Sequence, residues 1–488
     1  MLIKLDRESP VPVYEQIKEH IRGLIEEGRL KPGARLPSSR SLADTLGVNR
    51  TTVCTAYEEL EADGYLASHV GQGTYVIAPD EFVGKSAACG GNAGFDFHFA
   101  RRSDAVRAGP PRDNALMEGS EDQIMFSGLT PEEALFPVEP FRTALNTVMR
   151  ERGRELLQYG HPQGYLPLRE YISTRLVRYS INVPPEQIVI VNGSQQGIDL
   201  ILRVLVDPGD RVVVESPTYS GMLPVLLQYE CEVVTVPVGI DGMDLDALER
   251  VLAGRPTRLI YSMPNFHNPT GATIDLAGRQ RLVEIVNEYH TPLVEDDYEK
   301  DLRFEGTSIV PVKALDTIGG VIYMGTFSKG LFPGVRVAWI AAAHEVVERL
   351  VLAKRYTDYH TNMLMQAAIA EFCWQGHYDA HLRRLHKIYR LRRRKLFEAL
   401  TREFPPEVIW TRPEGGYALW VTMPSKIYAE ELLTAAQQQG VFFTPGNRFY
   451  LASGGEHSFR LCFSRTDAEQ IDEGISRLGT LIKQRLLK

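Results

Sequence analysis

The chain has 488 residues and a net charge of −8. This length indicates more than one domain, and the net acidity excludes DNA affinity spread over the whole surface, so any DNA contact requires a local basic patch. Five scattered cysteines without a CxxC pair argue against a disulfide framework or a zinc site, and the chain lacks a signal peptide or an apolar run that could span a bilayer; we therefore expect a cytoplasmic protein with no metal and no membrane contact.

The first expected unit is residues 1–78. Apolar residues recur at helical spacing over 12–28, which predicts an amphipathic helix. Ser38 is a typical N-cap for a second, short helix that Gly47 ends. Asn49 caps a third helix. Two short helices joined through a glycine turn are typical of a helix-turn-helix.

Two strands, at 65–68 and 74–77, are expected to complete a winged helix-turn-helix. Charge within this unit is uneven, because residues 29–53 contain five Lys or Arg and one Asp, a net of +4. The positive charge therefore gathers where the turn and the third helix begin, which is the end of a recognition helix that enters the major groove. A helical-bundle interaction module is the alternative interpretation.

Glycine and proline interrupt residues 79–121, which we predict to be a linker. Over 122–488 the pattern is α/β and predicts a mostly parallel sheet covered on both faces. The last part, approximately 378–488, begins with a long basic helix and is expected to form a smaller α+β domain. The expected strands of the large domain lie at 188–191, 211–214, 233–236, 259–261, 292–294, 321–324 and 337–341.

The most informative motif is Thr326-Phe327-Ser328-Lys329, followed by Arg336. An aldehyde cofactor that carries a phosphate needs a lysine amine to form a Schiff base, and hydroxyl groups and a guanidinium to bind the phosphate. The segment offers all three kinds of group within eleven residues.

Further motifs follow other expected strands. Asp296 stands at a strand end, where its carboxylate can meet a protonated ring nitrogen, and Tyr298 lies two residues on, on the same side of an extended chain. Asn268 follows another strand and offers a second donor to a ring hydroxyl. Ser194 and Gln195 lie at a strand-to-helix junction that favours a phosphate.

Taken together, these motifs make residues 122–488 similar to the fold-type I pyridoxal phosphate-dependent aminotransferases. The resemblance implies that Lys329 forms the Schiff base with pyridoxal 5'-phosphate and that Asp296 faces the ring nitrogen. It implies that Tyr298 and Asn268 bind the ring hydroxyl. It implies a phosphate site made of Ser194, Gln195, Thr326, Ser328 and Arg336.

The same resemblance assigns three more residues. Tyr219 would stack on the ring, and Arg460 would bind the α-carboxylate of a substrate or effector. Tyr159 would reach the phosphate of a partner subunit, which implies a homodimer.

The first 78 residues resemble the GntR family of winged helix regulators, through the stretches 12–17, 36–40, 46–53 and 71–76. A GntR head before an aminotransferase-like body is the architecture of the MocR subfamily. The resemblance implies DNA contacts from the turn, the third helix and the wing. These residues are Arg40, Asn49, Arg50, Thr51, Thr52, Gly71 and Gly73.

The resulting hypothesis is a transcriptional regulator whose body senses a small amine or amino acid by aldimine exchange at Lys329. One alternative is an active aminotransferase with an accessory DNA-binding head, since the set of catalytic residues is intact. Another is a sensor of pyridoxal phosphate itself, without an amine effector.

Overall fold

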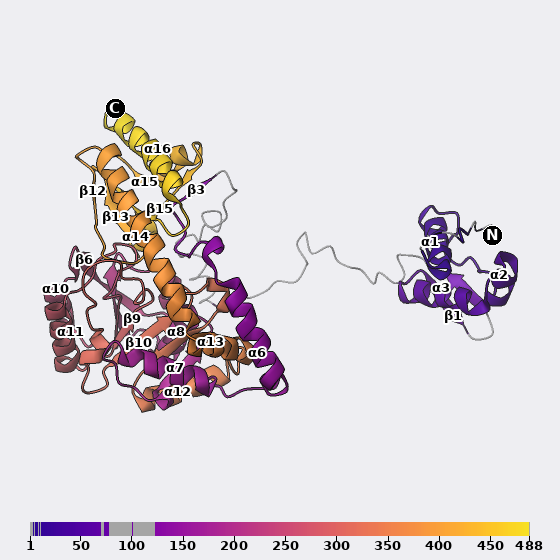
Figure 1. Ribbon diagram of the computed structural model, residues 1–488, viewed down its shortest axis with the longest axis horizontal. Helices are drawn as coiled ribbons and strands as arrows, with labels where there is room; N and C mark the ends of the chain where they lie inside the picture. Colours follow the sequence, from indigo (N-terminus) through magenta and orange to yellow (C-terminus); the bar gives the residue numbers. More distant parts are fainter. Residues whose placement is uncertain are drawn as a thin grey trace. The chain divides into compact units, whose positions relative to one another are not determined.

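The computed structural model describes residues 3, 5–7, 9, 11–69, 73–77, 100 and 123–487. The chain divides into two compact units, residues 1–98 and 99–488, which we call the head and the body (Figure 1). The expected linker, apart from residue 100, and Gly71 of the wing lie outside the described residues. Within the described residues, no helix combines the length and the apolar character that a membrane crossing requires.

The described residues of the head form three helices and a two-stranded antiparallel sheet. The hydroxyl of Ser38 accepts from the Ser41 N–H at 3.2 Å and begins the second helix, which Gly47 ends with a φ of 62°. The Asn49 side chain caps the third helix by accepting from the Thr51 N–H. The elements are α1 (Val13–Glu26), α2 (Ser39–Leu46), α3 (Arg50–Ala62), β1 (Leu66–His69) and β2 (Gly73–Val76).

An eight-stranded sheet in the order β4-β11-β10-β9-β8-β5-β6-β7 forms the centre of the body. The run from β10 to β6 is parallel, whereas β11 is antiparallel to both of its neighbours and β7 is antiparallel to β6. The strands are β4 (Ile188–Val191), β5 (Arg211–Ser216), β6 (Glu232–Gly239), β7 (Gly242–Met243), β8 (Leu259–Ser262), β9 (Leu293–Asp296), β10 (Val321–Thr326) and β11 (Ala338–Ala341).

Helices cover both faces of this sheet (Figure 1). Every residue of β4, β8, β9, β10 and β11 is therefore buried. The mostly parallel sheet expected from the sequence is therefore confirmed, and each expected strand matches an observed one within a few residues. The helices are α6 (Val138–Leu156), α7 (Leu166–Val177), α8 (Ser194–Leu205), α9 (Met222–Gln228), α10 (Leu245–Gly254), α11 (Leu276–Glu288), α12 (His344–Arg355) and α13 (Met363–Trp374).

The C-terminal part carries a second, antiparallel sheet in the order β12-β13-β16-β15, and its helices α14 and α16 pack together. A short strand from the start of the body, β3 (Ile124–Met125), pairs in parallel with β14 of this part. The elements are α14 (His377–Glu403), β12 (Ile409–Trp410), β13 (Ala418–Thr422), α15 (Ala429–Gln437), β14 (Val441–Phe442), β15 (Thr444–Pro445), β16 (Ser458–Cys462) and α16 (Ala468–Leu486).

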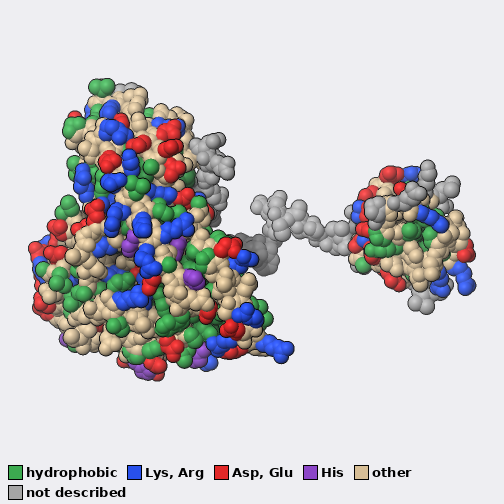
Figure 2. Space-filling model, in the orientation of Figure 1, with side chains coloured by type: hydrophobic (Ala, Val, Ile, Leu, Met, Phe, Trp, Pro, Cys, Tyr) green, Lys and Arg blue, Asp and Glu red, His purple; other side chains and the backbone are tan. Residues whose placement is uncertain are grey.

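The basic helix expected near residue 378 is α14, and its positive charges are partly buried and partly exposed. Arg392 and Arg393 are buried and pair with Glu132 and Glu305. Figure 2 shows further Lys and Arg side chains along this helix on the visible face of the body. The exposed ones are Arg383, Arg384, Lys387, Arg390, Arg394 and Arg402.

Candidate functional site

A cavity of about 220 Å³ lies where β9, β10 and the loops after β4, β5 and β8 meet at one edge of the sheet. This is the position at which parallel sheets bind ligands. The cavity is lined by all the predicted cofactor residues except Tyr159. Its lining residues are Leu129, Thr130, Ser194, Gln195, Tyr219, Met263, Asn268, Asp296, Tyr298, Thr326, Ser328, Lys329, Pro333 and Arg336.

Lys329 follows β10 and lies deep in this cavity. Its Nζ donates a hydrogen bond to the backbone oxygen of Leu129 at 2.6 Å. Burial lowers the pKa of the Lys329 amine, and the Glu299 carboxylate opposes this shift. A lowered pKa leaves more of the amine uncharged at neutral pH, and the uncharged amine is the form that attacks an aldehyde.

Asp296 is the last residue of β9, and its carboxylate is buried. One oxygen, Oδ2, accepts from the hydroxyl of Tyr261 at 2.7 Å, whereas Oδ1 is buried with no hydrogen-bond partner. Burial raises the pKa of Asp296 to about 7, which the Tyr261 hydrogen bond partly offsets. A buried oxygen without a partner is costly unless a ligand supplies a donor.

Asn268 and Tyr298 line the same cavity. The Oδ1 of Asn268 accepts from Arg460 at 2.8 Å, which orients the amide and leaves its NH₂ group to donate. The hydroxyl of Tyr298 donates to the backbone oxygen of Phe266 at 2.7 Å. Its hydrogen is therefore already used in this arrangement, although the oxygen can still accept a hydrogen bond.

The other end of the cavity suits an anion. Ser194 and Gln195 stand at the N-terminus of α8, whose free N–H groups favour negative charge. The guanidinium of Arg336 donates to the backbone oxygen of Asn192 at 3.1 Å. At Gly193, a Cβ atom would lie 2.4 Å from a nitrogen of Arg336, so only glycine allows this approach.

The hydroxyl groups of Thr326 and Ser328 also face this end and are linked to each other at 3.1 Å. Tyr219 also lines the cavity, and its hydroxyl donates to the Gln195 side chain at 3.3 Å. These groups together offer the hydroxyl donors, helix N–H groups and cation that a phosphate requires.

Arg460 on β16 does not line the cavity itself but stands behind Asn268. It is buried, and it donates to Asn268 and, at 2.7 Å, to the backbone oxygen of Ser127. Its guanidinium lies over the ring of Phe449, 5.0 Å from the centroid. Within the described residues no Asp or Glu lies at ion-pair distance from it. A buried cation without a counter-ion favours an anionic ligand.

Tyr159 is 84% exposed and stays outside the cavity of its own chain. Its ring contacts the ring of Tyr359, with centroids 5.3 Å apart. Tyr356, which is close in the sequence to Tyr359, is 80% exposed. The position of Tyr159 is thus that of a residue with no role in its own site.

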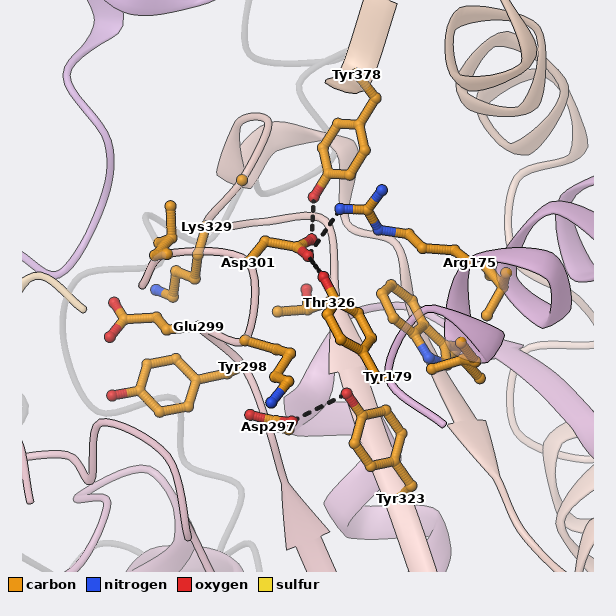
Figure 3. A pocket seen from close by; sticks show the side chains of 16 residues that line it. Arg175, Tyr179, Asp297, Tyr298, Glu299, Asp301, Tyr323, Thr326, Lys329 and Tyr378 are labelled. Carbon is orange, nitrogen blue, oxygen red and sulfur yellow. Dashed lines mark hydrogen bonds and ion pairs between the residues drawn. The ribbon is translucent and has the colours of Figure 1, made fainter. Parts of the chain in front are cut away.

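Glu299 is a functional candidate that the sequence did not indicate. Figure 3 shows its carboxylate facing the amine of Lys329. One of its oxygens, Oε1, is buried without a partner, and burial raises the pKa of Glu299 to about 7. The residue is the last of four acids in the run 295–299, and the direction of its side chain beyond the strand end could not be read from strand periodicity.

Two acids close to Glu299 in the sequence, Asp297 and Asp301, have structural partners. Asp297 accepts from Asn265 at 2.8 Å and from Tyr323 at 3.1 Å. Asp301 pairs with Arg175 at 2.7 Å and accepts from Tyr378 at 3.0 Å (Figure 3). These buried networks hold the loop after β9 and so fix the positions of Asp296 and Glu299.

In the head, four of the predicted DNA-contacting residues lie at the start of α3, whereas Arg40 lies on α2 and Gly73 begins β2. Arg40, Asn49, Arg50 and Thr51 are exposed, and Thr52 is half-buried. The oxygen of Asn49 serves as the helix cap, which leaves its NH₂ group for other contacts. Gly73 has a φ of 114°, and a Cβ atom there would lie 2.8 Å from Arg35.

Two known families match separate parts of the chain. Residues 13–76 match the family described as bacterial regulatory proteins, gntR family. Residues 129–478 match the family described as aminotransferase class I and II. The boundary between the two matches falls between the head and the body.

Relatives of nearly the same length combine both parts. The chain is 34% identical over 486 residues to the probable rhizopine catabolism regulatory protein MocR of Rhizobium meliloti, with 98% of this chain and 95% of that protein covered. It is 30% identical over 489 residues to the HTH-type transcriptional regulator TauR of Rhodobacter capsulatus, with 96% of each covered.

A crystal structure of LysN, an alpha-aminoadipate aminotransferase from Thermus thermophilus complexed with N-(5'-phosphopyridoxyl)-L-leucine, resembles the body with a TM-score of 0.75. The identity is 37%, and the match covers 80% of this chain and 98% of that one.

The residues of the cavity fit pyridoxal 5'-phosphate, the cofactor that the family match indicates. The buried Asp296 Oδ1 lacks only a donor, the lysine amine is present, and the far end gathers phosphate-binding groups around Arg336. The matches of both parts and the full-length relatives disfavour an enzyme with an incidental head. The chain belongs to the MocR-type GntR regulators, DNA-binding transcriptional regulators with a pyridoxal phosphate-dependent, aminotransferase-like body.

Proposed function

We propose that the body senses a small amine with a carboxylate, such as an amino acid, and that its binding changes the affinity of the head for DNA. One observation carries the proposal. A single cavity presents a lysine amine of lowered pKa, a buried carboxylate oxygen without a partner, and behind Asn268 a buried arginine without a counter-ion.

Lys329 is the residue at which the exchange takes place. The cofactor, when bound, supplies an aldehyde that the Lys329 nitrogen holds covalently and reversibly and that a free amine can take over. Burial favours the neutral form of Lys329, and Asp296 provides a carboxylate oxygen for the ring N–H. Ser328 and Arg336 keep the phosphate in place, so exchange at Lys329 releases the lysine and not the cofactor.

Arg460 selects effectors that carry a carboxylate. Its guanidinium already bonds Asn268 and Ser127, while its Nε is buried without a partner. A carboxylate that entered beside Asn268 would supply the missing anion, and a charge-assisted bond of this kind contributes about 1.5–3 kcal/mol. Amines without a carboxylate are therefore expected to be weak effectors.

The head is proposed to read DNA with the start of α3. Arg50 and Thr51 are exposed there, and Arg40 is exposed on α2. The acids near the end of α3 are partly neutralised, since Lys18 pairs with Glu59 and with the C-cap residue Asp63 at 2.9 Å. Thr52, the free amide of Asn49 and the wing glycines 71 and 73 complete the proposed contact surface. In a homodimer two heads would read two half-sites.

The test is an operator-binding titration of the full chain, with the operator obtained by selection from random DNA. We expect pyridoxal phosphate followed by a panel of amino acids to reveal at least one that shifts operator affinity by about 5- to 150-fold. Lys329→Ala should abolish this shift while leaving the affinity of the effector-free head intact. An equal shift in Lys329→Ala would contradict the proposal.

A parallel assay addresses the enzyme alternative. Sustained release of a keto acid from any amino acid of the panel, with no change in operator affinity, would identify the body as an aminotransferase in its own right. A shift produced by pyridoxal phosphate alone, unaltered by every amino acid, would identify the cofactor as the signal.

A further inference from the structure

Residues 127–130 follow β3 and accept hydrogen bonds from Lys329 and Arg460, the two side chains that an effector is proposed to engage. We call them the 127–130 segment. Only Phe126 separates the segment from β3, the first strand of the body. Leu129 and Thr130 line the cavity. No motif or periodicity in the sequence connects them with the site.

The backbone oxygens of the segment are bound by side chains of the site. Leu129 O accepts from Lys329 at 2.6 Å, and Ser127 O accepts from Arg460 at 2.7 Å. Ser464 also donates to Gly128 O at 3.2 Å. Three consecutive carbonyl groups thus depend on side chains of the body, and two of these side chains are the ones that an effector would engage.

The segment also bridges two parts of the body. Phe126 is bonded through its backbone to Phe442 at 2.8 Å and to Cys462 at 2.8 Å, so residues 124–126 pair with the C-terminal part. Lys329 follows β10 of the large sheet. The hydrogen bond from Lys329 to Leu129 therefore connects the large sheet to the segment that directly follows the first strand of the body.

This tie depends on the chemical state of Lys329. A free lysine carries two or three N–H bonds and can reach Leu129 O, as it does here. A lysine nitrogen that is covalently held at the ring has at most one hydrogen and a position set by the ring. An effector that releases Lys329 would also supply a carboxylate to Arg460, which competes with Ser127 O for the guanidinium.

We propose that the 127–130 segment reads the state of Lys329 and Arg460 and passes it to the chain that leads to the head. This inference rests on the proposed function, because it names the route by which the site acts on the DNA-binding unit. The released lysine holds Leu129 O, and the covalently held lysine lets it go.

The experiment compares two forms of the full chain in which the cavity is equally filled. Pyridoxal 5'-phosphate engages Lys329 covalently, whereas pyridoxamine 5'-phosphate has no aldehyde and leaves the lysine free. Hydrogen exchange is followed for the peptide 123–135, and operator affinity is measured for both forms. We expect the amides of 127–130 to exchange at least about threefold more slowly in the pyridoxamine phosphate form, because local opening is suppressed there.

A variant tests whether the segment transmits the state. Ser464→Ala removes the bond to Gly128 O, and Ser458→Ala is the matched control, a buried serine on β16 that bonds Thr422 instead. In the wild-type chain and in Ser458→Ala we expect the two forms to differ in operator affinity by at least about fivefold. In Ser464→Ala this ratio should fall by at least half.

The outcomes separate the inference from the proposed function. If the two forms bind the operator differently but exchange equally at 127–130, the segment is not the route, and the sensing function stands. If the two forms bind the operator equally, the segment does not transmit the state of Lys329 and the inference fails, whereas the sensing function is decided separately by the amino-acid titration. A loss of the ratio in both serine variants would also overturn the segment, because it would show a general loosening of the C-terminal part.

Discussion

Asp296 and Asp297 are neighbours in the sequence, yet they have opposite surroundings. Asp297 is fully engaged by Asn265 and Tyr323, whereas Asp296 keeps one buried oxygen without a partner. The first arrangement stabilises the loop after β9. The second is stable only when a ligand supplies a donor, so the two residues can be separated by experiment.

We predict that Asp296→Asn weakens pyridoxal phosphate binding by roughly 10- to 150-fold, since a charge-assisted bond of about 1.5–3 kcal/mol is lost. The measurement is a titration of cofactor-free protein followed by the visible absorbance of the bound cofactor. Asp297→Asn is the control and should lower the melting temperature of the body while changing cofactor affinity by less than about threefold. Equal affinities for Asp296→Asn and the wild type would refute the assignment.

Glu299 makes the stability of the body depend on pH. Burial raises its pKa from 4.5 to about 7, so the folded chain binds this proton more tightly than the unfolded chain. Stability from this group is therefore present at low pH and is lost as the pH rises from about 4.5 to about 7. Asp296 and Glu295, whose pKa values are also raised to about 7, act in the same direction.

Replacing Glu299 by Gln should remove this contribution. We predict that the difference in unfolding free energy, Glu299→Gln minus wild type, is about 1–3 kcal/mol more positive at pH 8 than at pH 5. Denaturation of the cofactor-free chain followed by tryptophan fluorescence measures it, because all four tryptophans lie in the body. Exposed Glu288→Gln should show no such difference, and a flat difference for Glu299→Gln would contradict the prediction.

The limits of prediction at the residue scale follow from geometry. That Lys329, Asp296 and the proposed phosphate-binding residues line one cavity could be predicted, because they occur next to strand ends along the chain. The environment of Glu299 could not, because its burial depends on packing against Tyr417 and Gly416, more than a hundred residues away. The hydrogen bond from Tyr298 to the Phe266 carbonyl could not be predicted either, because it also depends on how two separate loops pack together.

At the scale of elements, local signals located the helices and strands well. The caps at Ser38 and Asn49 and the left-handed Gly47 predicted the two ends of α2 and the start of α3. The pairing of β3 with β14 was not predictable, because two residues in each strand carry no periodic signal and more than 300 residues separate them. That pairing is what places the 127–130 segment at the site.

The recognition helix gives a prediction at this scale. Arg50 begins α3, is exposed and bonds the hydroxyl of Ser39 at 3.4 Å. We expect Arg50→Ala to weaken operator binding by about 1–3 kcal/mol, with a smaller loss for random DNA if the side chain reads a base and an equal loss if it binds a phosphate. Fluorescence anisotropy at several salt concentrations distinguishes the two cases.

The matched control for Arg50 is on another helix of the head. Arg22 on α1 is also partly exposed, but it pairs with Glu19 at 2.6 Å and with Glu26 at 3.7 Å. Arg22→Ala should leave operator affinity within about twofold, in line with the small energy of exposed ion pairs. Unchanged affinity in Arg50→Ala would move the DNA-binding surface away from the start of α3.

At the scale of the whole molecule, the sequence located two units because composition and periodicity change between them. Their chemistry is separate: the head has a basic turn and no cavity residues, while the body holds the cofactor site. We propose that communication between the two runs through the chain that joins them and involves a second copy of the protein. Exposed aromatic residues around Tyr159 point to the second copy.

Tyr159 is the test of the homodimer. An aromatic side chain that is 84% exposed and lies outside its own cavity is unfavourable in a lone subunit and typical of an interface. If its hydroxyl binds the phosphate in the partner's cavity, Tyr159→Phe removes one charge-assisted bond and leaves the interface apolar. We predict a cofactor affinity lower by about 10- to 150-fold, from about 1.5–3 kcal/mol, with the dimer intact in sedimentation.

Mixed dimers make this prediction decisive. Lys329→Ala and Tyr159→Phe subunits with different tags are combined, so each dimer has one cavity with the intact lysine and the intact Tyr159 of the other subunit. That cavity should bind pyridoxal phosphate with wild-type affinity, whereas Tyr159→Phe homodimers should not. Tyr356→Phe, which alters an equally exposed tyrosine, is the control and should bind normally. Weak binding in the mixed dimer would show that Tyr159 acts within its own subunit, and a monomeric wild-type chain would exclude the shared site altogether.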